Sequence, residues 1–363
     1  MLSAMSICVF KKNGDGMKIV VDKFIPYING VLEPFAEVQY LAPADFTPEA
    51  VRCADALVVR TRTRCDGALL ADSAVKFIAT ATIGYDHIDT QFCAEHGIAW
   101  TNAAGCNASA VAQYVASALG VWAHDGRRDL RKLTLGIVGV GHVGRKVLKM
   151  ANLLGMSVLQ NDPMRADVEN SADFVSLDTV AAHADVITFH TPLTHGGRYA
   201  TYHLADADFF EKCVRKPLII NAARGGVVDE QALKQALRCG RVAACVVDCW
   251  ENEPHIDREL LDLSLLATPH IAGYSADGKA TATAMSVRAV SRFFGLGLDD
   301  FRVAQLPPKP ICRCTYSALL QKMVENYNIR CDDTALRHQP DAFERLRSGY
   351  SLRREVDYLL ENQ

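Results

Sequence analysis

The sequence predicts an α/β protein built on two doubly wound parallel sheets, with a small α+β domain after them. Three observations support this prediction: apolar runs of strand length alternate with helical patterns, a glycine-rich turn follows one run, and a charged segment follows a proline-rich stretch. Strands that alternate with helices need crossover connections, which makes the sheets parallel. The apolar runs are residues 19–21, 56–59, 77–79, 135–138, 186–189, 218–221 and 244–247.

The domain boundaries follow from where these runs lie. Strand-like runs occur well before the glycine-rich turn, so this turn belongs to a second domain. The helical pattern at 108–123 is the expected link between the two domains, and the proline-rich stretch at 307–310 marks the boundary before the tail. The expected domains are a first one over 17–102 and 272–300, a second one over 103–271, and a C-terminal one over 301–363.

Residues 1–16 are expected to form an appendage. Their apolar run is short, has no basic start and is followed by Lys11 and Lys12, which matches a secretory signal peptide poorly. The pattern that begins at Met17 is typical of a first strand, so Met1 and Met17 are both candidates for the true start. The first domain is therefore expected to begin at residue 17.

Composition excludes several classes of function. The chain has 363 residues, 49% of them hydrophobic, and 39 basic against 42 acidic side chains. No basic stripe predicts nucleic-acid binding, and no run of about 20 apolar residues predicts a membrane span. The 12 cysteines are scattered without Cys-x-x-Cys pairs, which favours reduced thiols over disulfides or a metal site. We therefore expect a cytoplasmic protein without a bound metal.

The most informative motif is Gly139-Val-Gly-His-Val-Gly144. The apolar run before it predicts a buried strand, and residues 143–154 predict an amphipathic helix. Gly139 permits a tight turn, Gly141 lets a pyrophosphate approach the backbone, and Gly144 lets the helix pack against the strand. The free N–H groups at the start of the helix, near His142 and Val143, would bind the phosphates. The motif thus predicts a Rossmann-type dinucleotide site.

The second strand of this unit determines which dinucleotide is expected. The apolar run 157–159 ends at Asp162, about 20 residues past the glycines, where this fold places a carboxylate on the ribose hydroxyls. A carboxylate there repels a 2′-phosphate, so NAD is expected in preference to NADP, although Arg165 nearby weakens the preference. The alternative is that Asp162 is a plain turn residue at the end of a strand.

Three later segments place polar side chains directly after strand-like runs. They contain Arg224 within 221–226, Glu253 within 250–254 and His270 after a Thr-Pro pair. Singly, these residues could be a surface charge, a loop residue and a core histidine. Open α/β sheets bind ligands at the carboxyl ends of their strands, so together the three residues predict an acid–base site.

The glycine motif, His190-Thr-Pro-Leu-Thr194 and these three segments resemble the D-isomer-specific 2-hydroxyacid dehydrogenase family over about residues 17–294. The resemblance implies an NAD-dependent oxidoreductase acting on CH–OH, with Arg224, Glu253 and His270 as catalytic residues. The chemistry agrees, because oxidation of an alcohol needs a base for the hydroxyl proton while a hydride leaves for nicotinamide. His270 would be that base, Glu253 would orient it, and Arg224 would hold the substrate carboxylate.

Further stretches are similar to a member of this family that acts on a small phosphorylated 2-hydroxy acid and has a C-terminal dimerisation domain. This similarity implies a homodimer with two sets of contact residues. The implied substrate contacts are Thr61, Thr82 and Tyr274. The implied NAD contacts, besides the glycine motif and Asp162, are Thr191, Ala222, Ala223, Arg224, Asp248 and Gly273.

A phosphorylated substrate has two anionic ends, and Arg224 can bind only the carboxylate. Arg60, at the end of a strand-like run, is a candidate for the phosphate. Other candidates exist if the tail of one subunit reaches the partner's cleft in a two-fold dimer. They are Arg345, Arg347, Arg353 and Arg354, for each of which a solvated helix face is the alternative.

Two other functions remain open at this point. A phosphoglycerate dehydrogenase or another D-2-hydroxyacid dehydrogenase would share the catalytic residues, although the tail of about 60 residues has no βαβ pattern typical of a regulatory domain. An NAD-sensing, corepressor-like scaffold could use the same fold chiefly to bind a partner. Turnover with a panel of 2-hydroxy acids distinguishes the three functions.

Overall fold

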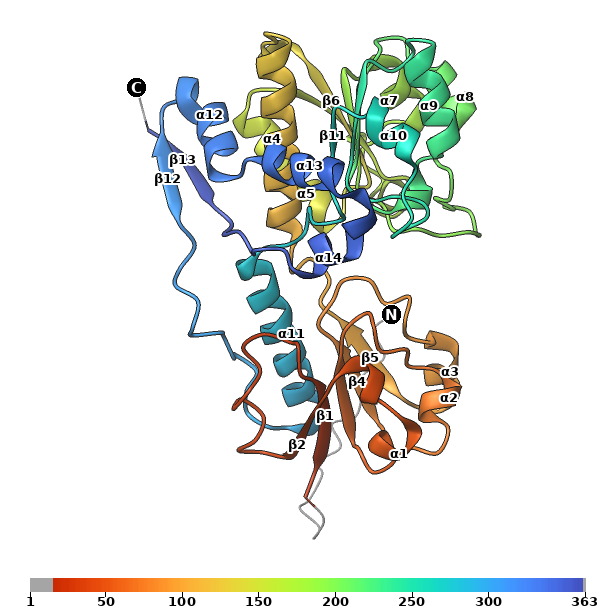
Figure 1. The fold of residues 1–363 in the computed structure, drawn as a ribbon, viewed down its shortest axis with the longest axis vertical. Coiled ribbons are helices and arrows are strands. Elements are labelled where there is room, and N and C mark those ends of the chain that lie inside the picture. Colours follow the sequence, from red (N-terminus) through yellow and green to blue (C-terminus); the bar gives the residue numbers. More distant parts are fainter. Residues whose placement is uncertain (1–15, 362–363) are drawn as a thin grey trace. The chain divides into compact units, whose positions relative to one another are not determined.

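The computed structural model describes residues 16–361, so the predicted appendage lies outside them except for Gly16. These residues form two compact units, which we call unit 1 and unit 2 (Figure 1). Unit 1 consists of the described part of Met1–Asn107 together with Ala276–Pro308, and unit 2 consists of Ala108–Ser275 with the described part of Lys309–Gln363. Most of the predicted C-terminal domain is therefore grouped with unit 2.

Unit 1 is built on a five-stranded parallel sheet with the order β2-β1-β3-β4-β5. The strands are β1 (Lys18–Asp22), β2 (Glu37–Leu41), β3 (Ala56–Val59), β4 (Phe77–Thr80) and β5 (Ala99–Asn102). The helices are η1 (Pro43–Asp45), α1 (Pro48–Val51), α2 (Gly67–Leu70), α3 (Thr90–Glu95) and the long α11 (Ala276–Phe294).

The core of unit 1 joins the sheet to α11. The central strands β3 and β4 are buried along their whole length, which their continuous apolar runs predict. The ring of Phe77 stacks on that of Phe293 with centroids 4.6 Å apart, and Val287 and Val290 are fully buried in the same cluster. The helix α11, which follows the whole of the second large sheet in the chain, thus completes this unit.

Unit 2 contains a six-stranded parallel sheet with the order β11-β10-β9-β8-β6-β7. Its strands are β6 (Thr134–Val138), β7 (Ser157–Asn161), β8 (Val186–Phe189), β9 (Leu218–Asn221), β10 (Ala244–Val247) and β11 (Leu266–Ala267). The chain order reverses between β6 and β8, and ligands of such sheets bind outside the strand ends at this switch point.

Helices precede, connect and cover these strands. They are α4 (Ala108–Asp125), η2 (Leu130–Lys132), α5 (His142–Leu153), α6 (Pro163–Glu169), α7 (Leu177–His183), α8 (Ala207–Glu211), η3 (Gly225–Val227), α9 (Glu230–Arg238) and α10 (Arg258–Leu263). None of the helices within residues 16–361 combines the length and the apolar character that crossing a membrane requires.

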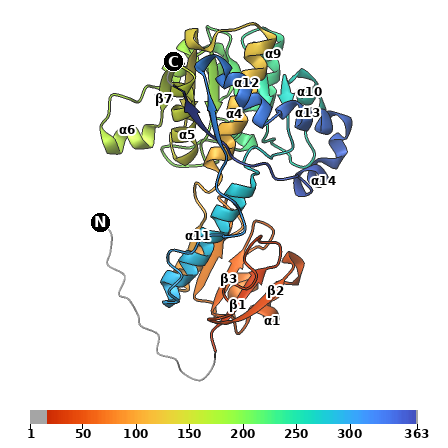
Figure 2. The ribbon, with the colours of Figure 1, turned by 90° about the vertical axis from the view of Figure 1, so that its left-hand side faces the viewer.

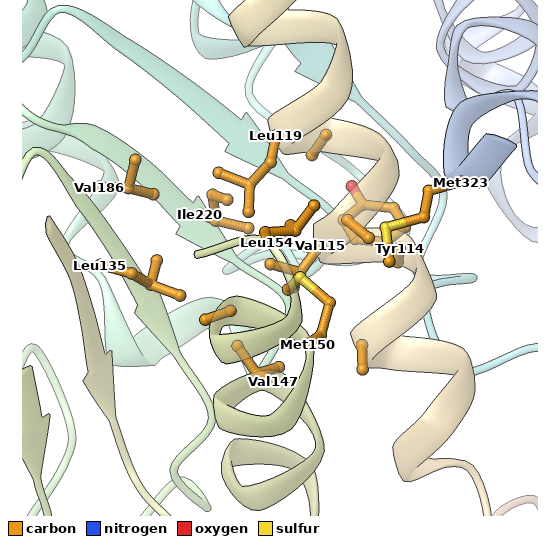
Figure 3. Close-up of a cluster of buried hydrophobic side chains, with 14 of the residues drawn as sticks. Tyr114, Val115, Leu119, Leu135, Val147, Met150, Leu154, Val186, Ile220 and Met323 are labelled. Atoms are coloured by element: carbon orange, nitrogen blue, oxygen red, sulfur yellow. The ribbon is translucent and has the colours of Figure 1, made fainter. Parts of the chain in front are cut away.

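One face of this sheet packs against α4 and α5. Figure 3 shows Leu135, Val186 and Ile220 of the sheet pointing toward Leu119 of α4 and Val147 of α5. The cluster is shielded from solvent. This packing fixes the start of α5 against the end of β6, where the glycine motif lies.

The C-terminal segment folds back onto unit 2, as the two views in Figures 1 and 2 show. It contains β12 (Ile311–Cys314), α12 (Tyr316–Asn326), α13 (Ile329–His338), η4 (Pro340–Ala342), α14 (Phe343–Ser348) and β13 (Asp357–Leu360). Strands β12 and β13 form a separate parallel pair. Phe343 and Leu336 are fully buried in the cluster that also contains Trp250, so the tail shares a core with the loop that carries Glu253.

The predicted fold class is confirmed: both large sheets are parallel and doubly wound, and a small strand pair with helices follows them. All seven apolar runs are strands, and the helices predicted at 108–123 and 143–154 are α4 and α5. The prediction missed the edge strands β2 and β5, which are only partly buried and therefore lack a continuous apolar run.

The substitution Phe343→Ala should lower the free energy of unfolding of unit 2 by about 3–5 kcal/mol, because it opens a cavity at a fully buried ring. Urea denaturation followed by fluorescence measures this loss. Phe35→Ala, at a ring that is 42% exposed, is the control and should cost under about 1 kcal/mol. A similar loss in both variants would contradict the proposed anchoring of α14.

Candidate active site

Each of the three glycines of the motif is required, or tolerated, for a different steric reason. Gly139 has a φ of 88°, and a Cβ on it would lie 2.9 Å from the backbone N of Thr191. A Cβ on Gly144 would lie 2.2 Å from the carbonyl O of Gly139, so α5 could not pack as closely on the turn. A Cβ on Gly141 would meet open space. Gly141 is the N-cap of α5 and has no capping side chain, so the helix N-terminus faces that space.

The strand ends around this space suit a dinucleotide. β6 and β8 flank the switch point of the sheet, and Gly139 and His190 follow them directly. The buried Oγ1 of Thr191 and Nδ1 of His190 have no hydrogen-bond partner among the described residues. Buried polar atoms rarely lack partners, so these two indicate a polar ligand. With the open N-terminus of α5 beside them, the residues fit NAD.

Asp162 has a structural role in the same region. Its Oδ2 accepts a hydrogen bond of 2.9 Å from the N–H of Val140, within the glycine turn. Its Oδ1 caps α6 by accepting from the N–H of Arg165 at 3.1 Å. The guanidinium of Arg165 pairs with Glu169 and donates to the carbonyl of Val140. Asp162 therefore ties the second strand to the turn, and its contact with a ribose stays a prediction.

Arg224 lies in a tight turn at the end of β9. The side chain of Asn221 shapes this turn: its Nδ2 donates to the carbonyl of Arg224 at 3.0 Å, and its Oδ1 accepts from the N–H of Ala223 at 3.2 Å. Gly225 packs so closely that a Cβ would lie 2.0 Å from the carbonyl O of Trp250. The turn thus places Arg224 next to the loop that carries Glu253.

His270 and Glu253 form a hydrogen-bonded pair. The Nδ1 of His270 lies 2.8 and 2.9 Å from the two carboxylate oxygens of Glu253. The N–H of Trp250 also donates to Glu253, at 2.9 Å. The His270 side chain is 23% exposed and that of Glu253 18%, so both groups of the pair are largely shielded from solvent. The sequence predicted both residues for this role, and the structure brings them together.

The charge state of the pair follows from its surroundings. Burial raises the pKa of Glu253, but the hydrogen bond and charge of His270, the Trp250 N–H and the charge of Arg347 together bring this pKa below its usual value. An ionised Glu253 accepts a hydrogen bond from the protonated Nδ1 of His270. The Nε2 of His270 is therefore the nitrogen that can exchange a proton with a substrate.

Asp248 stabilises the loop of His270 by hydrogen bonds. This fully buried carboxylate accepts hydrogen bonds from the N–H groups of Ile271 at 2.8 Å and Ala272 at 3.0 Å, and from Thr268 Oγ1 at 2.7 Å. The hydroxyl of Tyr114 in α4 in turn bonds Thr268 at 2.8 Å. The sequence predicted Asp248 only as a contact of NAD, and its hold on this loop was not foreseen.

The structure places the other predicted residues in both units. Arg60, in unit 1, is paired with the fully buried Asp22, with Nε 2.9 Å from Oδ2. Thr61 is exposed, and Thr82 Oγ1 bonds Thr80 at 2.7 Å and the carbonyl of Gly84 at 3.0 Å. His142, Val143, Ala222, Ala223, Gly273 and Tyr274 belong to unit 2, as do all the predicted catalytic residues. Their contacts with substrate or NAD stay predictions.

Stability should depend on pH through His190. Burial lowers the pKa of His190 to about 3, whereas an unfolded histidine titrates near 6.5. The unfolded state therefore binds more protons between these values, and stability falls as the pH falls through this window, by up to about 1.4 kcal/mol per pH unit. Urea denaturation at several pH values should show a weaker pH dependence for His190→Gln than for the wild type. Equal slopes would contradict this.

Comparisons with known proteins agree with the geometry. The family model "D-isomer specific 2-hydroxyacid dehydrogenase, NAD binding domain" matches residues 108–272, the part of unit 2 that contains all three catalytic candidates. The erythronate-4-phosphate dehydrogenase of Bacteroides fragilis is 51% identical over 341 residues, which are 93% of this chain and 97% of that protein. The enzyme of the same name from Porphyromonas gingivalis is 42% identical and covers 94% of each chain.

Solved structures share the fold. The D-lactate dehydrogenase of Aquifex aeolicus, in complex with NAD and lactic acid, matches with a TM-score of 0.62 and 23% identity over 80% of this chain and 100% of that one. The predicted resemblance is confirmed at both levels, that of the fold and that of the sequence. The chain belongs to the family of D-isomer-specific 2-hydroxyacid dehydrogenases and, within it, to the group of the erythronate-4-phosphate dehydrogenases.

Proposed function

We propose that the chain oxidises 4-phospho-D-erythronate to 2-oxo-3-hydroxy-4-phosphobutanoate with NAD, as a step of pyridoxal 5′-phosphate (vitamin B6) biosynthesis. The observation that carries the reaction type is the bonded pair of His270 and Glu253, which Asp248 and the Arg224 turn hold at the carboxyl ends of β9, β10 and β11. The name shared by relatives that match this chain over most of its length supports the choice of substrate.

The side chains supply the proton transfer. The Nε2 of His270 takes the proton of the C2 hydroxyl while the C2 hydrogen leaves as a hydride, and the C2–O bond becomes a carbonyl. Glu253 stabilises the imidazolium that forms, because its carboxylate is bonded to Nδ1. When NAD is bound, its nicotinamide ring supplies the acceptor for the hydride. In the reverse direction the protonated His270 acts as the acid.

Arg224 is the proposed ligand of the substrate carboxylate. Its Nη1 donates to the carbonyl of Ala223 at 2.8 Å, which directs the guanidinium along the turn and leaves other donors for an anion. Thr61, Thr82 and Tyr274 are proposed as further substrate contacts, from the resemblance. Arg60 is a weaker candidate for the phosphate than the sequence suggested, because Asp22 already neutralises it.

NAD is proposed to bind at the N-terminus of α5. Its pyrophosphate would approach Gly141 and the N–H groups of His142 and Val143, where the structure is open. Thr191 and the Ala222–Arg224 turn would contact the nicotinamide side, and Asp162 the adenosine ribose.

We also propose that the chain is a cytoplasmic homodimer assembled through its tail. A two-stranded sheet is marginally stable alone, and the pair β12 and β13 exposes Ile311 by 57%, Leu359 by 44% and Leu360 by 39%. A second copy would cover these side chains and extend the sheet. The buried cysteines of the described residues form no disulfide, which agrees with a reducing compartment.

A substrate panel tests the function. With NAD, the wild type should oxidise 4-phosphoerythronate with a higher kcat/KM than 3-phosphoglycerate or unphosphorylated erythronate. His270→Asn should lower kcat by roughly two to four orders of magnitude and leave NAD binding unchanged. A preference for 3-phosphoglycerate would favour a phosphoglycerate dehydrogenase. Weak turnover of every acid would favour a scaffold that senses NAD.

The cofactor preference is tested with the same assay. The wild type should use NAD more than about tenfold better than NADP, because the carboxylate of Asp162 repels a 2′-phosphate. Asp162→Asn keeps only one of the two side-chain oxygens that accept from the N–H groups of Val140 and Arg165, so its fold is checked by thermal unfolding. The variant should narrow the difference in kcat/KM between the two cofactors. Comparable kcat/KM values for the two cofactors in the wild type would rule out this role of Asp162.

A further inference from the structure

We propose that the C-terminal segment 343–355 is part of the catalytic apparatus of its own chain, with Arg347 as a positioning residue that sets the charge balance of the Glu253–His270 pair. The proposal rests on the proposed function for the role of the pair. It differs from the expectation of the sequence, in which Arg347 was a phosphate ligand supplied across a dimer. The contacts below all lie within unit 2.

Arg347 reaches the pair from α14. Its Nη1 lies 3.5 Å from Oε2 of Glu253 and 3.6 Å from Oε1 of Glu344, and its guanidinium shares a hydrogen bond with Tyr274. The side chain is 26% exposed. An exposed ion pair contributes little, but this one joins two partly buried groups, and its carboxylate already binds the imidazole of His270. Arg347 thus contacts the same carboxylate that binds His270.

The segment 343–355 is anchored to unit 2 both before and after Arg347. Before Arg347, the fully buried ring of Phe343 packs in the core that contains Trp250. After Arg347, the guanidinium of Arg353 donates to the carbonyl groups of Ile271 at 3.2 Å and of Ala272, and it lies over the ring of Tyr327.

Arg353 and Asp248 act on the same two residues. Asp248 binds the N–H groups of Ile271 and Ala272, and Arg353 binds their carbonyl groups. The backbone after His270 is therefore held from both sides, once by the sheet and once by the tail. A displacement of the tail would release one side of the loop that carries His270.

The charges around the pair determine what Arg347 does. From the end of β10, Asp248 interacts with His270 and Cys249 with Glu253, and Arg347 interacts with Glu253 from α14. Around these groups, Arg224 interacts with Cys249, and Tyr274 and Glu344 interact with Arg347. Burial raises the pKa of Cys249 well above its usual range, so this thiol is neutral. Arg347 is the cation that approaches the carboxylate of Glu253 from the tail. Its charge weakens proton binding by the pair and keeps Nε2 available as a base.

The experiment compares Arg347→Met, which removes the charge, with Arg347→Lys, which keeps it. The control is Arg330→Met, which breaks another ion pair between the tail and the rest of unit 2, at Asp125, where Nη2 and Oδ2 lie 2.6 Å apart. Proton NMR follows the titration of the His270 ring, with its signal assigned from His270→Asn. Steady-state kinetics give kcat/KM against pH and the KM of phosphorylated and unphosphorylated substrates.

We expect the titration midpoint of the pair to rise by about half a pH unit to one unit in Arg347→Met, with the acid limb of kcat/KM moving equally. Arg347→Lys and Arg330→Met should keep the wild-type midpoint. An unchanged midpoint in Arg347→Met, or equal shifts in Met and Lys variants, would overturn the proposal. A rise in KM confined to the phosphorylated substrate, with no shift, would instead make Arg347 a phosphate ligand.

The NMR titration separates this proposal from the proposed function. If the wild type oxidises no 2-hydroxy acid, the proposed function fails. The midpoint of the His270 titration still decides whether Arg347 acts on the pair, because that measurement needs neither substrate nor turnover.

Discussion

A buried carboxylate, Asp248, organises the part of the molecule on which the chemistry depends. It lies at the end of β10 and is almost free of solvent contact, so an unpartnered charge there would be very costly. Burial raises the pKa of Asp248, whereas the charge of His270, the Thr268 hydroxyl and the N–H groups of Ala272 and Ile271 lower it, and burial has the larger effect. These groups are all parts of the His270 loop. The same bonds that compensate the buried carboxylate therefore fix the loop of His270, the proposed acid–base residue.

The backbone of His270 shows why such a hold is needed. Its φ is +55°, a left-handed conformation that costs a residue with a Cβ about 1 kcal/mol or more. That conformation turns the ring toward Glu253 within two residues of the strand-end Thr268. The Thr268–Asp248 bond on one side and the Ile271 and Ala272 contacts on the other keep the loop in this state.

Much of this arrangement follows from local sequence patterns. A parallel strand buried on both faces is a continuous apolar run, so β3, β4, β8 and β9 were predicted almost to the residue. The carboxyl ends of parallel strands meet at one edge, so Arg224, Glu253 and His270 were placed together without any contact being known. Edge strands such as β2 have one neighbour and a partly exposed face, and their patterns are correspondingly weak.

The remainder depends on contacts between distant parts of the chain. Arg347 lies 94 residues from Glu253 in sequence, and no periodicity or spacing relates the two. The same is true of the ion pair of Arg60 with Asp22, 38 residues apart, and a phosphate contact of Arg60 stays a prediction. An arginine at the end of a strand indicates that an anionic group lies nearby. Only the fold shows whether a carboxylate of the same chain is close enough to be that group.

The tail combines two features: an exposed apolar strand pair and arginine contacts with the Glu253–His270 region. Its strands β12 and β13 expose apolar side chains, which the proposed second copy would cover. Arg347 of α14 contacts Glu253, and Arg353 binds the backbone after His270. The two regions belong to one segment that starts and ends in a single strand pair, because β12 opens it and β13 closes it. Any force that stabilises the strand pair therefore also favours the position of Arg347 and Arg353. If the proposed dimer forms through this strand pair, its assembly would also stabilise the positions of Arg347 and Arg353 through the backbone of the tail.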